Sequence, residues 1–236
     1  MIAIIQARVD SSRLPGKVLM EINKKSLVEI IYKRLKKTKK IKKILFAIPG
    51  DKKNLILKKK LKNLKIPFFK GSNSNVLKRY YDAAKKYKAE NIIRITADCP
   101  LVDIGIINNM INIFINKKID YISNNNPPTF PHGLDVEILN FFSLRQAYRF
   151  SKSKRDKEHV TYYITRNKKK FKIYNYKNKN NLSKVRVTID YIEDFNVVNK
   201  VFSYFYPDIY FGFNKIKKII KLKPKIFKEN NDRIII

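Results

Sequence analysis

The chain has 236 residues, of which 44% are hydrophobic and 12% aromatic, and its formal net charge at pH 7 is +34. We expect a single domain over residues 1–236, with a core of about 1–206 and a basic tail of about 207–236 whose role stays open. No apolar run reaches 18 residues, and the N-terminus lacks the basic lead-in and cleavage site of a signal peptide. The lone cysteine, Cys99, excludes an internal disulfide, so we expect a soluble protein of the reducing cytoplasm with no membrane span.

The positive charge comes mostly from lysine. Only eleven of the 53 basic residues are arginine, and the 42 lysines are spread along the whole chain. A nucleic-acid surface concentrates its basic residues and uses arginine for bidentate contacts. We therefore favour a lysine-biased proteome as the cause of the charge and keep nucleic-acid binding as the less favoured alternative. The few arginines then carry more information than the many lysines.

The first half of the chain alternates between strand and helix patterns. Strands are expected at Ile2–Gln6, Ile44–Ile48, Ile66–Phe69 and Asn91–Ile95. Helices are expected from Ser26 to about Lys37, from Asp51 to about Leu64 and from Asn75 to Tyr87. A capping box, Ser26-Leu-Val-Glu29, predicts the start of the first helix, and Asp51 is the predicted N-cap of the second. This alternation predicts an α/β fold, a three-layer α/β/α Rossmann-like arrangement with a mostly parallel sheet.

The second half is less regular. Helices are expected from Asp103 to about Asn116, at Phe142–Phe150, at His159–Asn167 and from Asp194 to about Tyr206. Strands are expected at Asp120–Ser123, Leu134–Leu139, Phe171–Tyr176 and Val185–Ile189. The pattern from Tyr210 onward supports no assignment.

Two polar loops follow two of the predicted strands. The loop Arg8–Lys17 leaves the first strand and holds three cations and two hydroxyls, and Asp98 follows the strand Asn91–Ile95. Ligands of open parallel sheets bind outside the carboxyl ends of the strands. In a 3-2-1-4 strand order these two strands are neighbours, so we expect Asp98 to share a cleft with the cationic loop.

The cationic loop suits a polyphosphate, because guanidinium forks and an ammonium match phosphate oxygens. It is not a Walker loop, since Val18 follows Gly16-Lys17 and Ser11 stands where the first glycine belongs. The alternative for such a loop is a solvated surface with scattered charges.

Asp98 and Asp190 each follow a strand-like segment. A lone aspartate in this position is usually a helix N-cap. Mg²⁺, however, binds one or two carboxylates together with phosphate oxygens. The two carboxylates and the cationic loop together favour a metal–nucleotide site.

The chain has two histidines, His132 and His159. Each is either a structural hydrogen-bonding group or part of a site, and their spacing does not suit zinc. Cys99 lacks an evident base and is expected to fill a small apolar space rather than act as a nucleophile.

Several short segments, taken in order, carry a resemblance that covers about residues 2–205. They are Ile4–Arg8, Ser11–Leu19, Phe69–Ser72, Val76-Leu77, Arg79-Tyr80, Arg94–Asp103, Gly133–Glu137, Glu158–Thr161, Val187–Asp190 and Glu193-Asp194. The set resembles the spore coat polysaccharide biosynthesis protein F type of cytidylyltransferase, which is related to the synthetases of CMP-KDO and CMP-sialic acid. The resemblance implies the nucleotide-diphospho-sugar transferase fold and a homodimer.

The same resemblance implies an enzyme that transfers CMP from CTP to a sugar acid or related sugar, with release of pyrophosphate, for surface polysaccharide or glycan synthesis. It implies CTP binding by Ala7, Arg8, Ser11, Ser12, Arg13, Lys17, Ser72, Arg79 and Asp98. It implies Mg²⁺ binding by Asp98 and Asp190, and catalytic roles for these two with Arg8, Arg13 and Lys17. It implies acceptor binding by His132, Gly133, Asp135, Glu137, Glu158 and His159. The residues supply no evident general base.

The chain departs from the family pattern in two places. Asn73, Ser74, Asn75 and Lys78 stand where acidic residues are usual, which leaves the base and ribose contacts of that loop open, and Ala97 stands where glycine is common. One alternative is a nucleotide-sugar-dependent glycosyltransferase on the same fold, which the Arg8, Arg13 and Lys17 spacing disfavours. The other is the basic nucleic-acid-binding protein.

Overall fold

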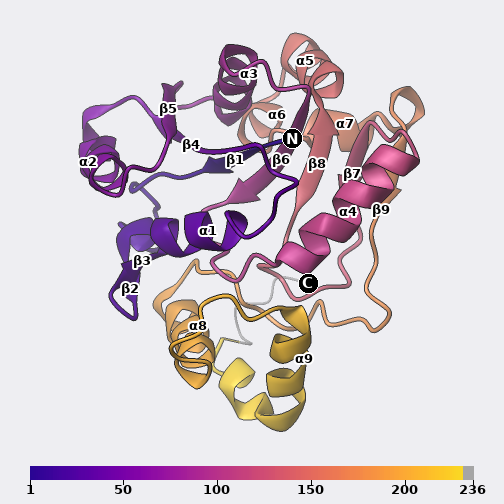
Figure 1. The fold of residues 1–236 in the computed structure, drawn as a ribbon. Helices are drawn as coiled ribbons and strands as arrows, with labels where there is room; N and C mark the ends of the chain where they lie inside the picture. Colours follow the sequence, from indigo (N-terminus) through magenta and orange to yellow (C-terminus); the bar gives the residue numbers. More distant parts are fainter. Residues whose placement is uncertain (231–236) are drawn as a thin grey trace.

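A seven-stranded sheet forms the centre of the computed structural model, which describes residues 1–230 (Figure 1). Its strands are β1 (Ile2–Gln6), β4 (Lys43–Pro49), β5 (Phe68–Gly71), β6 (Asn91–Thr96), β7 (Tyr121–Ser123), β8 (Glu137–Asn140) and β9 (Ile173–Asn175). They lie in the order β5-β4-β1-β6-β8-β7-β9, and only β8 runs antiparallel to its neighbours. A separate hairpin pairs β2 (Glu21–Ile22) with β3 (Lys25–Ser26). The predicted α/β class and the 3-2-1-4 order of the first four strands are confirmed.

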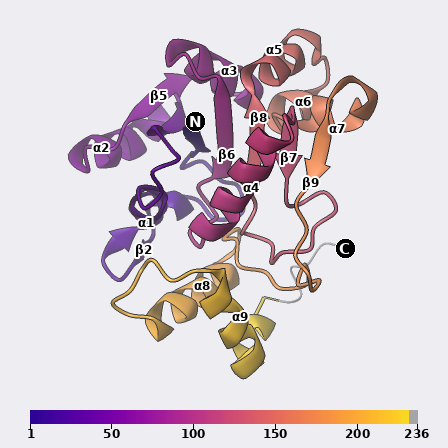
Figure 2. The same cartoon turned by 45° about the vertical axis from the view of Figure 1, so that its right-hand side comes forward.

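Helices cover both faces of the sheet. They are α1 (Leu27–Leu35), α2 (Leu55–Asn63), α3 (Val76–Lys86), α4 (Ile104–Asn116), α5 (Phe141–Phe150), α6 (Lys154–Glu158), α7 (Tyr162–Arg166), α8 (Ile192–Tyr204) and α9 (Phe213–Leu222). Side chains of α1, α2 and α4 share one core with α8 and α9, and those of α3, α5 and α7 form the other core. The central strand β1 contributes Ala3 and Ile5 to the first core and Ile4 to the second, as the alternation of side chains along a strand requires. Helices α8 and α9 lie together beyond one end of the sheet in both views (Figures 1 and 2).

The capping box predicted at Ser26 is wrong. Ser26 is the N-cap residue of α1, but its side chain makes no capping hydrogen bond. Its backbone pairs with Glu21 in the β2–β3 hairpin, and Glu29 forms an ion pair with Lys33 one turn later instead of reaching back. By contrast, the predicted N-cap at Asp51 is confirmed, since its carboxylate accepts the backbone N–H of Asn54 at 3.1 Å.

The strand predicted at Val185–Ile189 is also wrong. Residues 186–189 are buried, but the segment belongs to no strand of the sheet and forms one isolated bridge, between Arg186 and His132. Its backbone hydrogen bonds go to two loops: His132 exchanges bonds with Val185, Val187 and Thr188, and Ile189 donates to the carbonyl of Asp98 at 2.8 Å. The segment therefore does alternate between apolar and polar residues, but it packs against loops rather than against a sheet edge.

Other predicted boundaries shift. β5 and β8 begin later than predicted, at Phe68 and Glu137, and β9 is shorter. The helix predicted over 159–167 is shorter, because Val160 has a φ of 47° and α7 begins only at Tyr162. The region left unassigned after Tyr210 contains α9 and a short 3₁₀ helix, Pro224–Lys228. Among the described residues, no helix combines the length and apolar character needed to cross a membrane.

A buried arginine joins the C-terminal region to the rest of the fold. Arg34, at the end of α1, is 2% exposed and donates to four backbone carbonyls. Two lie after β6, at Leu101 and Val102, and two lie before α9, at Ile209 and Phe211. Burial lowers the pKa of Arg34 to about 10. One side chain therefore supplies the donors that two distant segments need.

We expect Arg34→Ala to lower the free energy of unfolding by about 3 kcal/mol, because it leaves buried carbonyls without a donor. The matched control is Lys33→Ala, which removes only the half-exposed pair with Glu29 and should cost less than about 0.5 kcal/mol. Urea unfolding followed by circular dichroism measures both. Equal losses for the two variants would contradict this role of Arg34.

Candidate active site

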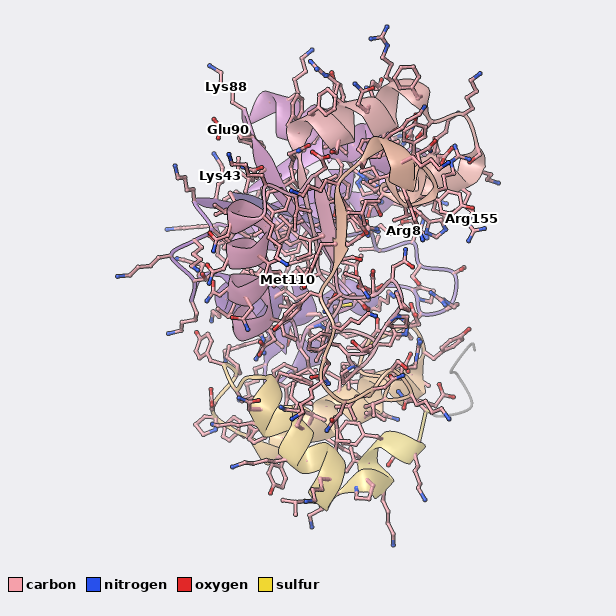
Figure 3. The ribbon with its side chains drawn as sticks, turned by 90° about the vertical axis from the view of Figure 1, so that its right-hand side faces the viewer. Arg8, Lys43, Lys88, Glu90, Met110 and Arg155 are labelled. Atoms are coloured by element: carbon pink, nitrogen blue, oxygen red, sulfur yellow. The ribbon has the colours of Figure 1, made fainter. Side chains whose placement is uncertain are left out.

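A pocket of about 590 Å³ opens where β1 and β6 end. Its walls come from the loop after β1, the loop after β6, the turn before α3, the loop before β8, the end of α6 and the segment 188–190. Figure 3 shows Arg8 and Arg155 on one side of the molecule, and Lys43, Lys88 and Glu90 on the opposite side, where β4 and β6 begin. The pocket thus lies at the sheet edge where open parallel sheets bind ligands.

Most of the predicted site residues line this pocket. They are Ala7, Arg8, Ser11, Arg13, Lys17, Arg79, Asp98, His132, Asp135, Glu137, Glu158, His159 and Asp190. Ser12, Ser72 and Gly133 are not among the lining residues. Ser12 is exposed, and the Ser72 hydroxyl accepts the backbone N–H of Asn75 at 3.1 Å, so it serves the turn before α3.

Lys17 stands at the centre of the site. Its ammonium is 3.0 Å from Oδ2 of Asp98, 2.8 Å from Oδ1 of Asp190 and 2.6 Å from the carbonyl oxygen of Ile189. Burial alone would lower the pKa of Lys17, but the carboxylates of Asp98 and Asp190 outweigh it and raise the pKa. Lys17 is therefore a permanent cation held between two carboxylates.

Asp190 is surrounded by cations. Oδ1 accepts from Lys17 and from Arg13 at 2.6 Å, and Oδ2 accepts from Arg186 at 2.8 Å. Burial alone would raise the pKa of Asp190, but Lys17, Arg186 and Arg13 lower it below its ordinary value. Asp98 is less enclosed, with a side chain that is 26% exposed. The site therefore places two carboxylates and several cations within one cavity.

Arg79 lines the same pocket without an ion-pair partner among the described residues. It is 2% exposed, and its Nε and Nη1 atoms have no hydrogen-bond acceptor within residues 1–230. The close approach of Gly71 makes room for it, since a Cβ there would lie 2.9 Å from Cγ of Arg79. Burial lowers the pKa of Arg79, and the positive charge of Arg8 lowers it further. A buried guanidinium with unused donors suits an anionic or carbonyl-bearing ligand.

Glu137 has a different role from the one expected. Its carboxylate pairs with Arg94 and accepts from the hydroxyls of Tyr121 and Thr161. Arg94 also donates to Oε1 of Gln6 at 3.0 Å. Burial alone would raise the pKa of Glu137, but Arg94 outweighs it and lowers the pKa. The carboxylate is therefore committed to partners in the pocket wall.

The loop before β8 brings His132 and Asp135 to the pocket. Nδ1 of His132 lies 3.0 Å from Nη1 of Arg186, and because a guanidinium only donates, Nδ1 is the acceptor. Neutral His132 therefore carries its proton on Nε2, which lies 3.8 Å from Oδ2 of Asp135. Burial raises the pKa of Asp135, although His132 and the N–H of Gly133 oppose this. Gly133 itself is needed for its shape: its φ is +109°, and a Cβ would lie 2.3 Å from the backbone nitrogen of Thr188.

Cys99 lies in the wall of the pocket and is buried. Burial and the charge of Asp98 raise the pKa of its thiol well above the ordinary value. The thiol is therefore neutral, which fits the expected space-filling role and not a nucleophile.

Arg94 and Arg186 are site residues that the sequence reasoning missed. Each is an arginine within an apolar run, between Ile93 and Ile95 or between Val185 and Val187. A guanidinium among apolar neighbours needs hydrogen-bond acceptors, which carboxylates or backbone carbonyls can supply. The pattern was therefore a usable signal for buried polar partners, although it did not say which residues supply them.

A divalent cation fits the arrangement. The carboxylates of Asp98 and Asp190 converge on one point, which the ammonium of Lys17 occupies, and oxygen is the donor that Mg²⁺ prefers. Within residues 1–230 no group of three or more His, Cys, Asp or Glu side chains could hold a metal. A metal here would thus need further oxygens from a ligand or from water, which is the usual way of binding Mg²⁺.

We expect Glu137→Gln to lower the free energy of unfolding by about 3 kcal/mol, because it leaves the buried Arg94 without its counter-charge. The matched control is Glu158→Gln, an exposed pocket residue, which should stay within about 0.5 kcal/mol of the unchanged protein. Urea unfolding of both variants measures the difference. A stable Glu137→Gln protein would show that Glu137 is not committed to the wall.

Comparison with known proteins identifies the fold and the family. A solved cytidylyltransferase from Leptospira borgpetersenii superposes with a TM-score of 0.91 at 31% identity, covering 96% of this chain and 95% of that one. The spore coat polysaccharide biosynthesis protein SpsF of Bacillus subtilis is 28% identical over 206 residues, 84% of this chain and 85% of SpsF. The structure of CMP:2-keto-3-deoxy-manno-octonic acid synthetase complexed with CTP superposes with a TM-score of 0.66 at 13% identity, covering 86% and 98% of the two chains.

The family model described as "Cytidylyltransferase" matches residues 2–234. This match takes in every element that builds the pocket, from β1 to α8. The chain therefore belongs to the cytidylyltransferase family of CTP-dependent nucleotidyltransferases.

Proposed function

We propose that this protein transfers CMP from CTP to a sugar acid or a related sugar in the synthesis of a surface polysaccharide or glycan. The observation that carries the proposal is the ammonium of Lys17 between Asp98 and Asp190 in a pocket that Arg8, Arg13 and Arg79 also line. Cations and carboxylates in one cavity suit a substrate that is both a polyphosphate and a metal ligand. The relationship to SpsF and the fold shared with the synthetase complexed with CTP support the same substrate class.

The phosphates of CTP would lie along the loop after β1. Arg8 is exposed in the pocket and has no ion-pair partner among the described residues, whereas Arg13 is about half exposed and reaches Asp190. Backbone and hydroxyl groups of Ala7, Ser11 and Ser12 would add neutral donors. These cations would neutralise the charge that develops on the departing pyrophosphate.

The nucleoside would lie toward the turn before α3. Arg79 lines the pocket there, and two further lining residues are Asn73 and Ser74. These are neutral where acidic residues are usual in the family, so the charge of Arg79 is not cancelled at that point. Ser72 would act by holding the turn rather than by touching the nucleotide.

Asp98 and Asp190 would hold Mg²⁺, which would polarise the α-phosphate when bound. In the structure Lys17 occupies the point between them, so metal binding requires the ammonium to move or share that space. A phosphate oxygen is a suitable new partner for the ammonium. The reaction forms a bond from the acceptor oxygen to the α-phosphorus and breaks the bond that joins this phosphorus to the pyrophosphate.

The acceptor would enter near α6. Glu158, His159 and Lys154 are exposed side chains at this wall, and His132 and Asp135 line the pocket from the loop before β8. Lys154 and His159 offer donors to a carboxylate, and Glu158 offers an acceptor for sugar hydroxyls. Gly133 and Glu137 would contribute by shaping this wall.

We also propose that the enzyme works in the cytoplasm as a homodimer. The buried free thiol of Cys99 supports a reducing compartment, and the resemblance to sugar-acid synthetases supports the dimer.

Purified protein with CTP, Mg²⁺ and a panel of sugar acids should release pyrophosphate. We expect Asp98→Asn to reduce this release by about 10²- to 10³-fold, as the loss of a group that stabilises transition-state charge typically does. The matched control is Asp82→Asn on α3, where the carboxylate meets only Lys78 on the surface. A coupled pyrophosphate assay measures the rates. Unchanged release in Asp98→Asn would refute the proposed role of this carboxylate.

Lys17→Met should move two affinities in opposite directions. Removing the ammonium leaves Asp98 and Asp190 facing each other, so Mn²⁺ alone should bind about tenfold more tightly. CTP without metal should bind about tenfold more weakly, because a phosphate partner is lost. Titration calorimetry measures both affinities, with Lys60→Met as the surface control. If both affinities fell, Lys17 would not be a stand-in for the metal.

A further inference from the structure

The segment after α9 does not line the pocket, yet it contacts the hydrogen-bond network of Arg186 and Asp194, which holds Asp190. The 3₁₀ helix Pro224–Lys228 follows α9, and its Phe227 is buried in the same core as α8. Glu229 then forms an ion pair with Lys200 of α8. Asn230 comes next and is 1% exposed, although it is polar.

The side-chain amide of Asn230 joins two buried partners. Its Nδ2 donates to Oδ1 of Asp194 at 2.8 Å and to the carbonyl oxygen of Arg186 at 3.2 Å. Asp194 is in the first turn of α8 and fully buried, and Arg186 precedes that helix in the chain. One amide group therefore ties the C-terminal segment to both.

Asp194 in turn holds Arg186 and the backbone at Asp190. Its Oδ1 accepts from Nε of Arg186 at 2.8 Å, and its Oδ2 accepts from Nη2 of Arg186 at 3.0 Å. Oδ2 also accepts the backbone N–H of Asp190 at 2.8 Å and of Tyr191 at 3.0 Å. Asp194 therefore fixes both the guanidinium behind Asp190 and the main chain that carries Asp190.

Arg186 is the partner that keeps Asp190 from turning wholly toward Lys17 and Arg13. Arg186 donates to Oδ2 at 2.8 Å, while Lys17 and Arg13 share Oδ1. If Arg186 moves away, the Asp190 carboxylate loses the hydrogen bond to Oδ2, and its orientation relative to Lys17 and Arg13 is no longer fixed. Asn230 restrains Arg186 through two hydrogen bonds. One goes to the carboxylate of Asp194, which binds the guanidinium of Arg186, and the other goes to the backbone carbonyl of Arg186.

We propose that Asn230 is a positioning residue of the active site, which holds the Asp190 carboxylate in place through Asp194 and Arg186. This rests on the proposed role of Asp190 in binding CTP with its metal. Outer-shell partners of a ligating carboxylate typically change metal affinity or activity by about 10- to 100-fold when removed. The C-terminal segment is thus part of the site, although no atom of Asn230 lines the pocket.

The test measures binding of CTP in the presence of Mg²⁺ by titration calorimetry. Asn230→Asp keeps the shape but turns an oxygen toward the carboxylate of Asp194, and Asn230→Ala removes the amide with less strain. We expect the affinity to fall about tenfold in either variant that stays folded, as judged by its thermal unfolding. The control Glu229→Gln removes the neighbouring ion pair with Lys200 and should bind as the unchanged protein does.

A second experiment, in the Asp190→Asn variant, distinguishes a positioning role of Asn230 from a purely structural one. In Asp190→Asn protein, the further change Asn230→Ala should alter the affinity less than twofold, because the charge that Asn230 positions is already gone. Normal affinity in folded Asn230→Ala, or a full tenfold loss that persists in the Asp190→Asn background, overturns the proposal. Failure of the unchanged protein to bind CTP would instead refute the proposed function.

Discussion

The ammonium of Lys17, shared by the carboxylates of Asp98 and Asp190, is the interaction on which the site depends. The three residues are far apart in the sequence and meet only because β1 and β6 are neighbours and the segment 185–190 packs across their ends. Two carboxylates in such a place repel each other unless a cation stands between them. The fold therefore keeps a cation site assembled, and Lys17 occupies it in the structure.

The arrangement also explains how a chain with a net charge of +34 can hold an ordered active site. Lys17 is the one buried lysine among residues 1–230, whereas Arg34, Arg79 and Arg186 are all buried arginines. The exposed lysines are solvated and contribute little to the geometry. The buried cations are each tied to carbonyls or carboxylates, except for Arg79, whose Nε and Nη1 atoms have no acceptor within residues 1–230.

Much of the central fold could be predicted from the sequence, because buried strands and amphipathic helices leave clear periodic patterns. The alternation predicted a parallel sheet, and a 3-2-1-4 strand order, taken as a premise, then predicted the meeting of Asp98 and the cationic loop. The strand predicted at Val185–Ile189 was wrong because an alternating sequence pattern is the same whether the segment pairs with a strand or with loops. The capping box predicted at Ser26 was wrong because the backbone of Ser26 pairs with Glu21 in the β2–β3 hairpin.

Contacts made through several side chains were beyond sequence reasoning. Glu137 belongs to one of the motifs that carry the family resemblance. Only the structure shows that Arg94, Tyr121 and Thr161 all donate hydrogen bonds to its carboxylate. Asn230 lies in a segment with no readable pattern, and its partners are 36 and 44 residues away in the chain. Such networks depend on the final approach of elements, which local patterns do not encode.

The most direct test of the account is a crystal structure of the protein with CTP and Mn²⁺, in which the anomalous signal locates the metal. We expect one metal within about 2.2 Å of oxygens of both Asp98 and Asp190, with the ammonium of Lys17 moved onto a phosphate. A metal bound elsewhere, or CTP bound while Lys17 still bridges the two carboxylates, would contradict it.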